Sequence, residues 1–138
     1  MAFLKVYTRE ATGDKYPQSL AGSIHFAFSA DGKEYTALNS NYGMLFVLAH
    51  LRENNTIDAK DLREPKIYKG EGVYHIFAEK INQDGTLCDA EKVIMWTTTD
   101  FVRFGEQEYV NREQYQQELG AAREVIEISE AMLSDIKD

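Results

Sequence analysis

A repeated turn signal constrains the fold of this chain more than any other feature of its sequence. Ser29-Ala30-Asp31 and Thr98-Thr99-Asp100 share a pattern in which a hydroxyl residue stands two positions before an aspartate. An aromatic residue follows each aspartate four positions later, Tyr35 in the first copy and Phe104 in the second. Arg63-Glu64 before KIY is echoed by Arg123-Glu124 before VIEI. Both repeats recur after about 60 to 70 residues, a period that fits units of four strands.

Short runs in which apolar and polar residues alternate surround these turns. SIHFAFS, the pair Asp31-Gly32 and KEYTAL predict a first β-hairpin, because Asp-Gly supplies the positive φ that a tight turn needs. KIYKGEGVYHIFAEK predicts a second hairpin that turns at residues 70–72, and EKVIMWTTTDFVRFGE predicts a third that turns around Asp100. Residues 3–9 alternate in the same way and predict one more strand.

We therefore expect an all-β fold of tandem four-stranded antiparallel blades, an incomplete five-bladed propeller with a short C-terminal helix. Within a single domain or fragment of residues 1–138, residues 3–38 would form a partial first blade and 62–106 a second. Residues 123–128 would be a spare inner strand, and 129–137 a helix capped by Ser129. The spare strand can pair with the open edge at residues 3–9, within one chain or between two, and so complete two four-stranded sheets.

Two sheets cannot close a propeller ring, so their packing faces should remain partly apolar. We therefore expect a homo-oligomer, most simply a two-fold dimer with residues 123–128 at or near the contact.

Charge and composition narrow the classes of partner. The formal net charge is −8, and the sequence from Glu106 onward has nine acidic and three basic residues. Nucleic acid is therefore not expected as a partner. No apolar run is long enough for a membrane helix, and MAFLKVYTRE lacks the pattern of a signal peptide, so we expect a soluble cytoplasmic protein. Cys88 is the single cysteine, which excludes an internal disulfide. The three histidines have no metal-ligand spacing, and we expect neither a metal nor another cofactor.

Several of these blocks together resemble one enzyme family. The stretches FLKVYTRE, SIHFAFSADGKEYTALN, LREPKIY, GVYHIFAE and VIMWTTTDFVRF follow one another between residues 3 and 104. In order and spacing they resemble the N-terminal blades of the five-bladed propeller glycoside hydrolases of family 43, the arabinosidase and xylosidase group. The resemblance implies an inverting hydrolase, in which a general acid and a general base lie about 6.5 to 9.5 Å apart.

Carried over by residue, the resemblance yields an incomplete catalytic set. The family's Arg-Asp-Pro motif falls on Arg63-Glu64-Pro65, at the start of an inner strand, with Glu64 in place of the aspartate as the catalytic candidate. The base of the family lies on an inner strand that the first blade lacks, and the acid belongs to a later blade. The chain is therefore expected to be inactive as an isolated hydrolase, with a saccharide as its possible ligand. The alternative is a non-catalytic domain that binds carbohydrate or assembles with copies of itself.

Each candidate residue also has a purely structural interpretation. Glu64 can bind a sugar hydroxyl or form an ion pair with Arg63 or Lys66. Arg63, His75, Trp96 and His25 are candidate substrate-binding residues, but histidines and aromatic residues within strands also occur as packing residues. Asp31 and Asp100 are interpreted as turn residues, because a turn uses aspartate oxygens to bind nearby N–H groups.

Overall fold

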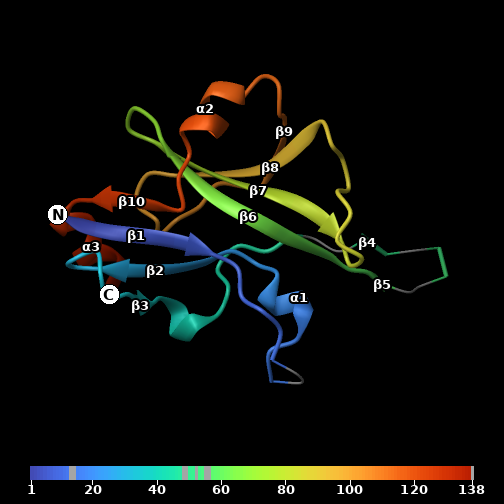
Figure 1. Cartoon of the computed structure of the whole chain (residues 1–138), viewed down its shortest axis with the longest axis horizontal. Coiled ribbons are helices and arrows are strands. Elements are labelled where there is room, and N and C mark those ends of the chain that lie inside the picture. Colours follow the sequence, from blue (N-terminus) through green and yellow to red (C-terminus); the bar gives the residue numbers. More distant parts are fainter. Residues whose placement is uncertain (13–14, 48–49, 52, 55–56, 138) are drawn as a thin grey trace.

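Two antiparallel four-stranded sheets make up most of the molecule (Figure 1). The computed structural model describes residues 1–12, 15–47, 50–51, 53–54 and 57–137. The first sheet has the order β10-β1-β2-β3 and the second the order β6-β7-β8-β9. Their strands are β1 (Ala2–Tyr7), β2 (His25–Ser29), β3 (Thr36–Ala37), β6 (Lys60–Lys69), β7 (Tyr74–Asn82), β8 (Lys92–Thr98), β9 (Glu108–Asn111) and β10 (Val125–Ile128). The mostly β character expected from the sequence is confirmed.

The remaining elements are short. Strands β4 (His50–Leu51) and β5 (Ile57–Asp58) form a separate pair. The helices are α1 (Gln18–Ala21), the 3-10 turn η2 (Asn39–Asn41), α2 (Gln116–Ala121) and α3 (Glu130–Lys137). The expected C-terminal helix is thus present, and Ser129 Oγ accepts a hydrogen bond from the N–H of Met132 at 3.1 Å, as a capping residue does. Among the described residues, no helix has the length and apolar character needed to cross a membrane.

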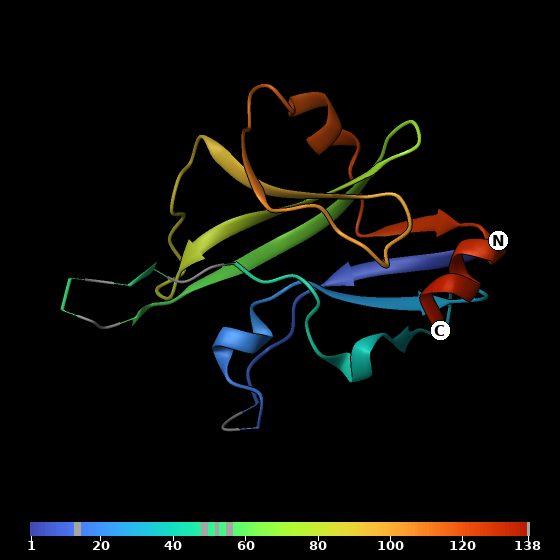
Figure 2. The ribbon, with the colours of Figure 1, turned by 180° about the vertical axis from the view of Figure 1, so that it is seen from behind.

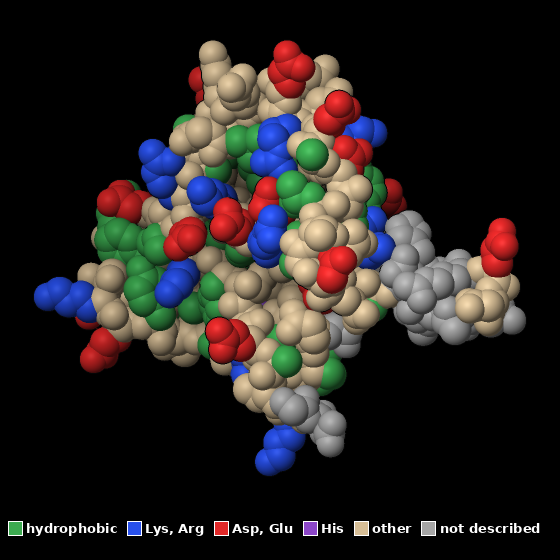
Figure 3. Space-filling view, turned by 45° about the vertical axis from the view of Figure 1, so that its right-hand side comes forward, with side chains coloured by type: hydrophobic (Ala, Val, Ile, Leu, Met, Phe, Trp, Pro, Cys, Tyr) green, Lys and Arg blue, Asp and Glu red, His purple; other side chains and the backbone are tan. Residues whose placement is uncertain are grey.

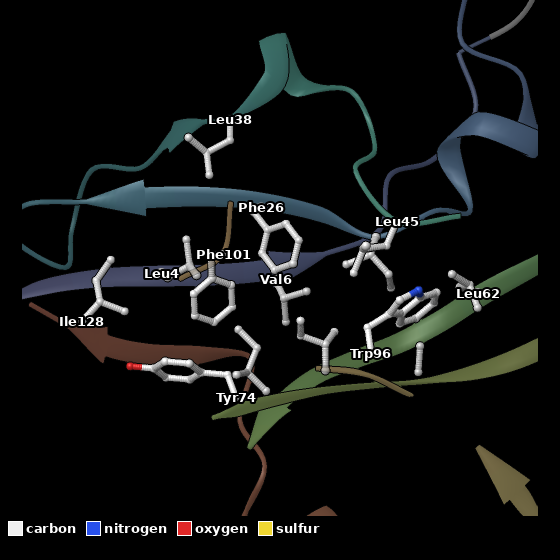
Figure 4. Close-up of a cluster of buried hydrophobic side chains, with 14 of the residues drawn as sticks. Leu4, Val6, Phe26, Leu38, Leu45, Leu62, Tyr74, Trp96, Phe101 and Ile128 are labelled. Atoms are coloured by element: carbon white, nitrogen blue, oxygen red, sulfur yellow. The ribbon is translucent and has the colours of Figure 1, made fainter. Parts of the chain in front are cut away.

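One hydrophobic core fills the space between the two sheets (Figure 4). Alternate residues of β1 point into it, so that Leu4 and Val6 are buried while their neighbours are partly exposed. Phe26 joins them from β2, and Ile76 and Ile94 come from the second sheet. Both four-stranded sheets are therefore covered on one face by the other.

The C-terminal strand completes the N-terminal sheet. β10 pairs with β1 in an antiparallel register that places Ala2 opposite Ile128 and Lys5 opposite Val125. The N–H of Val6 extends this ladder with a hydrogen bond to the carbonyl of Glu124 at 2.9 Å. The expected pairing of the spare strand with the open edge is confirmed, and it occurs within one chain.

The segment that precedes β10 also connects the two sheets. Arg123 and Ile67 of β6 exchange two backbone hydrogen bonds, of 2.7 and 2.8 Å. At another point of β6, the N–H of Leu62 donates to the carbonyl of Gly22 at 2.8 Å. Backbone hydrogen bonds as well as the core therefore hold the sheets together.

The first copy of the repeated turn shows why its residue types recur. Ser29 Oγ accepts hydrogen bonds from the N–H groups of Asp31 (3.3 Å) and Gly32 (2.8 Å). Asp31 Oδ1 in turn accepts from the N–H groups of Lys33 (2.8 Å) and Glu34 (3.0 Å). Gly32 has a φ of 80°, which glycine adopts without strain. The bonds from Glu34 and then Lys33 hold the pKa of Asp31 below its ordinary value.

The second copy reproduces this network atom by atom. Thr98 Oγ1 accepts from the N–H groups of Asp100 (3.3 Å) and Phe101 (2.9 Å), and Asp100 Oδ1 accepts from those of Val102 and Arg103, both at 2.9 Å. The bonds from Arg103 and Val102 lower the pKa of Asp100 in the same way. Phe101 replaces the glycine and keeps its left-handed backbone, with a φ of 58°. The interpretation of both aspartates as turn residues is confirmed.

The second expected hairpin is confirmed. The first keeps its pairing, but its second strand is only Thr36–Ala37 and follows a longer loop instead of a tight Asp-Gly turn. The third differs in its second strand. β2 pairs with β3, and β6 pairs with β7 around residues 70–72. After the turn at Asp100, Phe104 makes only an isolated bridge with Thr98, and the fourth strand is β9, beyond the expected end of the unit at residue 106. The ring of Phe101 is buried, and the ring of Phe104 stacks on that of Phe26 with 5.8 Å between centroids. This segment therefore packs over the core instead of pairing along β8.

Candidate functional site

The outer face of the second sheet carries a second apolar cluster beneath α2. Phe77, Val93 and Met95 are buried there, although this face points away from the main core. Tyr115 and Leu119, from the segment that contains α2, pack against them. Figure 1 shows α2 above this face of the sheet. Both faces of the second sheet are thus partly covered, and α2 forms one wall of a concave surface.

Charged side chains border this cluster in a linked arrangement. Glu79 on β7 accepts a hydrogen bond from Arg63 Nε through Oε1 and one from Arg112 Nη2 through Oε2, each at 3.0 Å. Arg63 also donates to the carbonyl of Gly85 at 3.0 Å, and Arg112 to that of Ala90 at 3.3 Å. Both carboxylate oxygens of Glu79 are therefore occupied by guanidinium groups, which are themselves held by backbone carbonyls.

Glu64 lies beside this cluster in an unusual backbone conformation. The pairing of β6 with β7 shifts register between Arg63 and Lys66, which marks a β-bulge, and Glu64 has a φ of 51°. A positive φ is uncommon outside glycine, asparagine and aspartate and is a strained state for glutamate. The side chain of Glu64 is exposed, and in the described part of the chain it forms no ion pair.

The expected position of the Arg63-Glu64-Pro65 motif at the start of a strand is therefore wrong. β6 begins at Lys60, and the motif lies in its interior. The bulge allows this, because Pro65 cannot donate a ladder hydrogen bond and bulges are among the few places in a sheet that tolerate proline. The ion-pair interpretation of Glu64 is also wrong, since Arg63 pairs with Glu79 instead.

Two concave spaces open on this face. A pocket of about 130 Å³, which we call the α2 pocket, is lined by Glu64, Lys66, Phe77, Glu79, Arg112 and Leu119, among others. An adjoining groove of about 930 Å³ shares Arg112 and Leu119 with it, and its other lining residues include Glu91, Asn111, Glu113, Gln114 and Gln116. Figure 3 shows a face of the molecule on which acidic and basic side chains are interleaved around a shallow hollow.

Glu64 is the carboxylate of the α2 pocket that is free to meet a ligand. Glu79 also lines the pocket, but two arginines already bind its oxygens. Inverting hydrolysis requires a general acid and a general base, each able to exchange a proton. Glu64 alone cannot supply both functions. The buried ring of Phe77 forms an apolar floor to the pocket, and charged groups lie around it.

His75, another predicted binding residue, lies on the same face farther along β7. Its ring contacts those of Tyr68 at 5.9 Å, Phe77 at 6.1 Å and Tyr115 at 6.5 Å between centroids. Its Nδ1 atom is buried and has no hydrogen-bond partner among the described residues. Three predicted site residues, Glu64, Arg63 and His75, are thus brought to one face.

Trp96 and His25 are not at this face, and their prediction as substrate-binding residues is not consistent with their positions. Trp96 is only 4% exposed and packs in the core near Leu45 and Leu62 (Figure 4). His25 is 0% exposed on β2 of the other sheet. Strand alternation turns both side chains toward the interior of the protein, and neither lines the α2 pocket.

His25 instead belongs to a buried hydrogen-bond network. Its Nδ1–H donates to the carbonyl of Ser23 at 2.9 Å, and its Nε2 accepts a short hydrogen bond from the hydroxyl of Tyr16. The N–H of Gly43 donates to the same hydroxyl at 3.1 Å, and the Arg9 guanidinium lies 4.0 Å from the centre of the Tyr16 ring. Because a carbonyl can only accept, Nδ1 must carry the proton of neutral His25. Burial lowers the pKa of His25, and the charge of Arg9 acts in the same direction.

Sequence reasoning missed Glu79, Arg112 and Asp61. Glu79 lies on β7 and Arg112 in the loop before α2, so no local spacing in the sequence indicates that they form an ion pair. Asp61 is 3% exposed, and its Oδ1 has no hydrogen-bond partner among the described residues. A Cβ atom on the neighbouring Gly22 would lie 2.7 Å from that oxygen, so the glycine makes room for the carboxylate. Burial raises the pKa of Asp61, and a hydrogen bond from Gln18 opposes this in part.

Within the described residues, no group of three or more histidine, cysteine, aspartate or glutamate side chains is placed to hold a metal ion. No protein-family model matches the chain, and comparisons with curated proteins and with solved structures find no significant match.

Proposed function

We propose that the α2 pocket is a non-catalytic binding site for a saccharide, in a chain related to the propeller glycoside hydrolases of family 43. The observation that carries the proposal is the position of Glu64, an exposed carboxylate held in a strained bulge at the edge of a pocket lined by Phe77. Strain of this kind costs stability and is concentrated at functional positions. Phe77 is only 1% exposed and forms an apolar floor, and the charged groups around it can bind the hydroxyl groups of a sugar.

Two features of the fold support the relationship to propeller blades. The repeated turn is equivalent in hydrogen bonding and backbone conformation in the two sheets. The first sheet is completed by the C-terminal strand, so that both sheets have four antiparallel strands, as propeller blades do. The arabinose- and xylose-containing saccharides of that family are therefore the first ligands to test.

The assay is calorimetric titration with arabino- and xylo-oligosaccharides. We expect weak binding in the wild type, and its loss in both Glu64→Gln and Glu64→Gly. Glu127→Gln, an exposed glutamate on β10, is the matched control and should bind as the wild type does. We expect no hydrolysis of aryl arabinofuranosides or xylosides by any of these proteins.

Glu64→Gly separates binding from folding. Glycine accepts a positive φ without strain, so this variant should raise the free energy of unfolding by about 0.5 to 1 kcal/mol while it removes binding. A loss of binding could then not be attributed to misfolding. Absence of heat up to millimolar saccharide, or unchanged binding in both Glu64 variants, would refute the proposed site.

Self-assembly is the second candidate function. The pairing of β10 with β1 inside one chain removes the open edge that would recruit a second copy. A homo-oligomer therefore stays a prediction that rests on exposed apolar side chains, among them Val125 at 38% exposure on β10. Light scattering behind a sizing column tests it, and a monomer of 15.8 kDa at tens of micromolar would contradict it.

A further inference from the structure

A second concave surface, which we call the apolar groove, lies where three segments meet at one side of the sandwich. They are the chain between β3 and β4, the loop after β8, and α3, and Figure 2 shows the first two with α3 at one end. Two adjoining depressions, of about 450 and 650 Å³, share Met44 and Phe104. Their apolar lining includes Leu38, Leu45, Trp96, Phe101, Val102 and Ile136. Several of these side chains belong to the main core, so the floor of the groove is the open border of that core.

Exposed apolar side chains extend this surface. Val102 is 52% exposed and lines the groove. Tyr42 and Phe46, at 51% and 44% exposure, flank the lining residues Gly43, Met44 and Leu45 along the chain. Three of the larger exposed hydrophobic side chains therefore come from the two loops that form the groove. A concentration of apolar surface of this kind is typical of an interaction site.

The charge of the groove indicates what kind of partner fits it. Among its described lining residues, Glu106 and Asp135 are the charged ones, and both are acidic. Both are exposed, and neither forms an ion pair within the described part of the chain. Arg103 is exposed next to Val102 but does not line the groove. An occupant that buries apolar side chains here meets carboxylates at the rim and gains from carrying positive charge.

From this charge pattern we propose that the apolar groove binds a partner protein through an apolar segment flanked by lysine or arginine. A second copy of this chain is a poorer occupant, because each copy has a formal net charge of −8. The proposal is independent of the α2 pocket, which shares no lining residue with the groove.

Trp96 provides the readout, because it is the single tryptophan and lines the groove. The probe is a tryptophan-free peptide of about 12 residues composed of leucine and lysine. Its counterpart has glutamate at every lysine position. We expect the leucine-lysine peptide to change the fluorescence of Trp96 in a saturable manner, and the leucine-glutamate peptide to bind at least about tenfold more weakly.

A pair of variants distinguishes the groove from general attraction to an acidic protein. Val102→Lys introduces a cation into the groove, and Val125→Lys makes the same substitution on β10. Both lower the net negative charge equally. We expect Val102→Lys to weaken binding at least about tenfold and Val125→Lys less than about threefold. Thermal unfolding confirms that both variants are folded, and Glu106→Gln with Asp135→Asn provides a second test in which binding should weaken without added bulk.

Three results would overturn the proposal. Equal weakening by the two lysine variants would show that only overall charge attracts the peptide. Equal binding of the two peptides would remove the charge selectivity. No change in Trp96 fluorescence up to millimolar peptide would show that the groove does not accept such a segment.

Discussion

Replacing Tyr16 by phenylalanine is the most direct test of the buried network around His25. The change removes one hydroxyl group and leaves the ring, which contacts His25 and Arg9, in place. That hydroxyl serves two buried groups, the Nε2 atom of His25 and the N–H of Gly43. The variant therefore tests hydrogen bonding at this position separately from packing.

The expected loss of stability follows from the two groups that are left without a partner. A buried polar group that loses its hydrogen bond costs about 1 to 3 kcal/mol. With two such groups, we expect the free energy of unfolding of Tyr16→Phe to fall by about 2 to 6 kcal/mol at pH 8. In a domain of this size, each kcal/mol lowers Tm by about 3 to 5 °C, so Tm should fall by about 6 to 30 °C.

The pH dependence should also change. Nε2 accepts a hydrogen bond in the folded wild type, and the pKa of His25 lies below its ordinary value of 6.5. The unfolded chain therefore takes up a proton near pH 6.5, while the folded chain takes it up only at lower pH. The wild type should lose stability as the pH falls below about 6.5, by at most about 1.4 kcal/mol per pH unit. In Tyr16→Phe no hydrogen bond to Nε2 is left to lose, so the dependence should be shallower.

Urea unfolding between pH 8 and pH 5, followed by Trp96 fluorescence, measures both effects. Tyr42→Phe is the matched control, because Tyr42 is 51% exposed and loses the same atom. The difference between wild type and Tyr16→Phe cancels the titration of groups elsewhere, such as Asp61. Stability curves that run parallel with pH, or a loss no larger than that of Tyr42→Phe, would refute the network as described.

Two further predictions concern the repeated turn and Asp61. Thr98→Val and Ser29→Ala should each lower the free energy of unfolding, measured in urea, by about 1 to 2 kcal/mol, because each leaves turn N–H groups without their acceptor. A neutral effect at either position would contradict the equivalence of the two turns. The pKa of Asp61 is raised, mainly by burial, so its contribution to stability is present at acid pH and is lost as the pH rises through the folded-state pKa. Asp61→Asn should therefore raise the free energy of unfolding by about 1 kcal/mol at pH 7 and by little near pH 4. Asp89→Asn, at an exposed position, is the control and should change neither value. An effect of Asp61→Asn that does not depend on pH would show that burial of the charge is not the cause.

Local patterns were sufficient to predict which strands pair in the first two hairpins, the role of the repeated turn residues and the pairing of β10 with β1. Ser29 and Thr98 act through bonds to residues within three positions, so their role can be read from neighbours in the sequence. The pairing of β10 followed from counting strands and open edges, which is also possible without coordinates.

The candidate site was harder to predict, because it depends on which face of a strand is covered. Alternation shows that Trp96 and its neighbour Thr97 point to opposite faces of β8, but not which face meets the other sheet. The bulge at Glu64 arises from a shift in register between β6 and β7. The sequence of one strand alone does not determine its register with the neighbouring strand. The contact between Arg112 and Glu79 is fixed by the path of the loop before α2.

The pairing of β1 with β10 also determines how the molecule responds to force. Ala2 lies opposite Ile128, so both ends of the chain leave this strand pair on the same side, as the positions of N and C in Figure 1 show. Tension applied through the two termini would break the hydrogen bonds of the antiparallel ladder one after another, rather than load all of them together in shear. The ladder would yield at low load, and α3, which follows β10 and places Leu133 in the core, would be pulled from it early. Attachment to a moving partner at both ends would thus release α3, and with it one wall of the apolar groove, before the second sheet is disturbed.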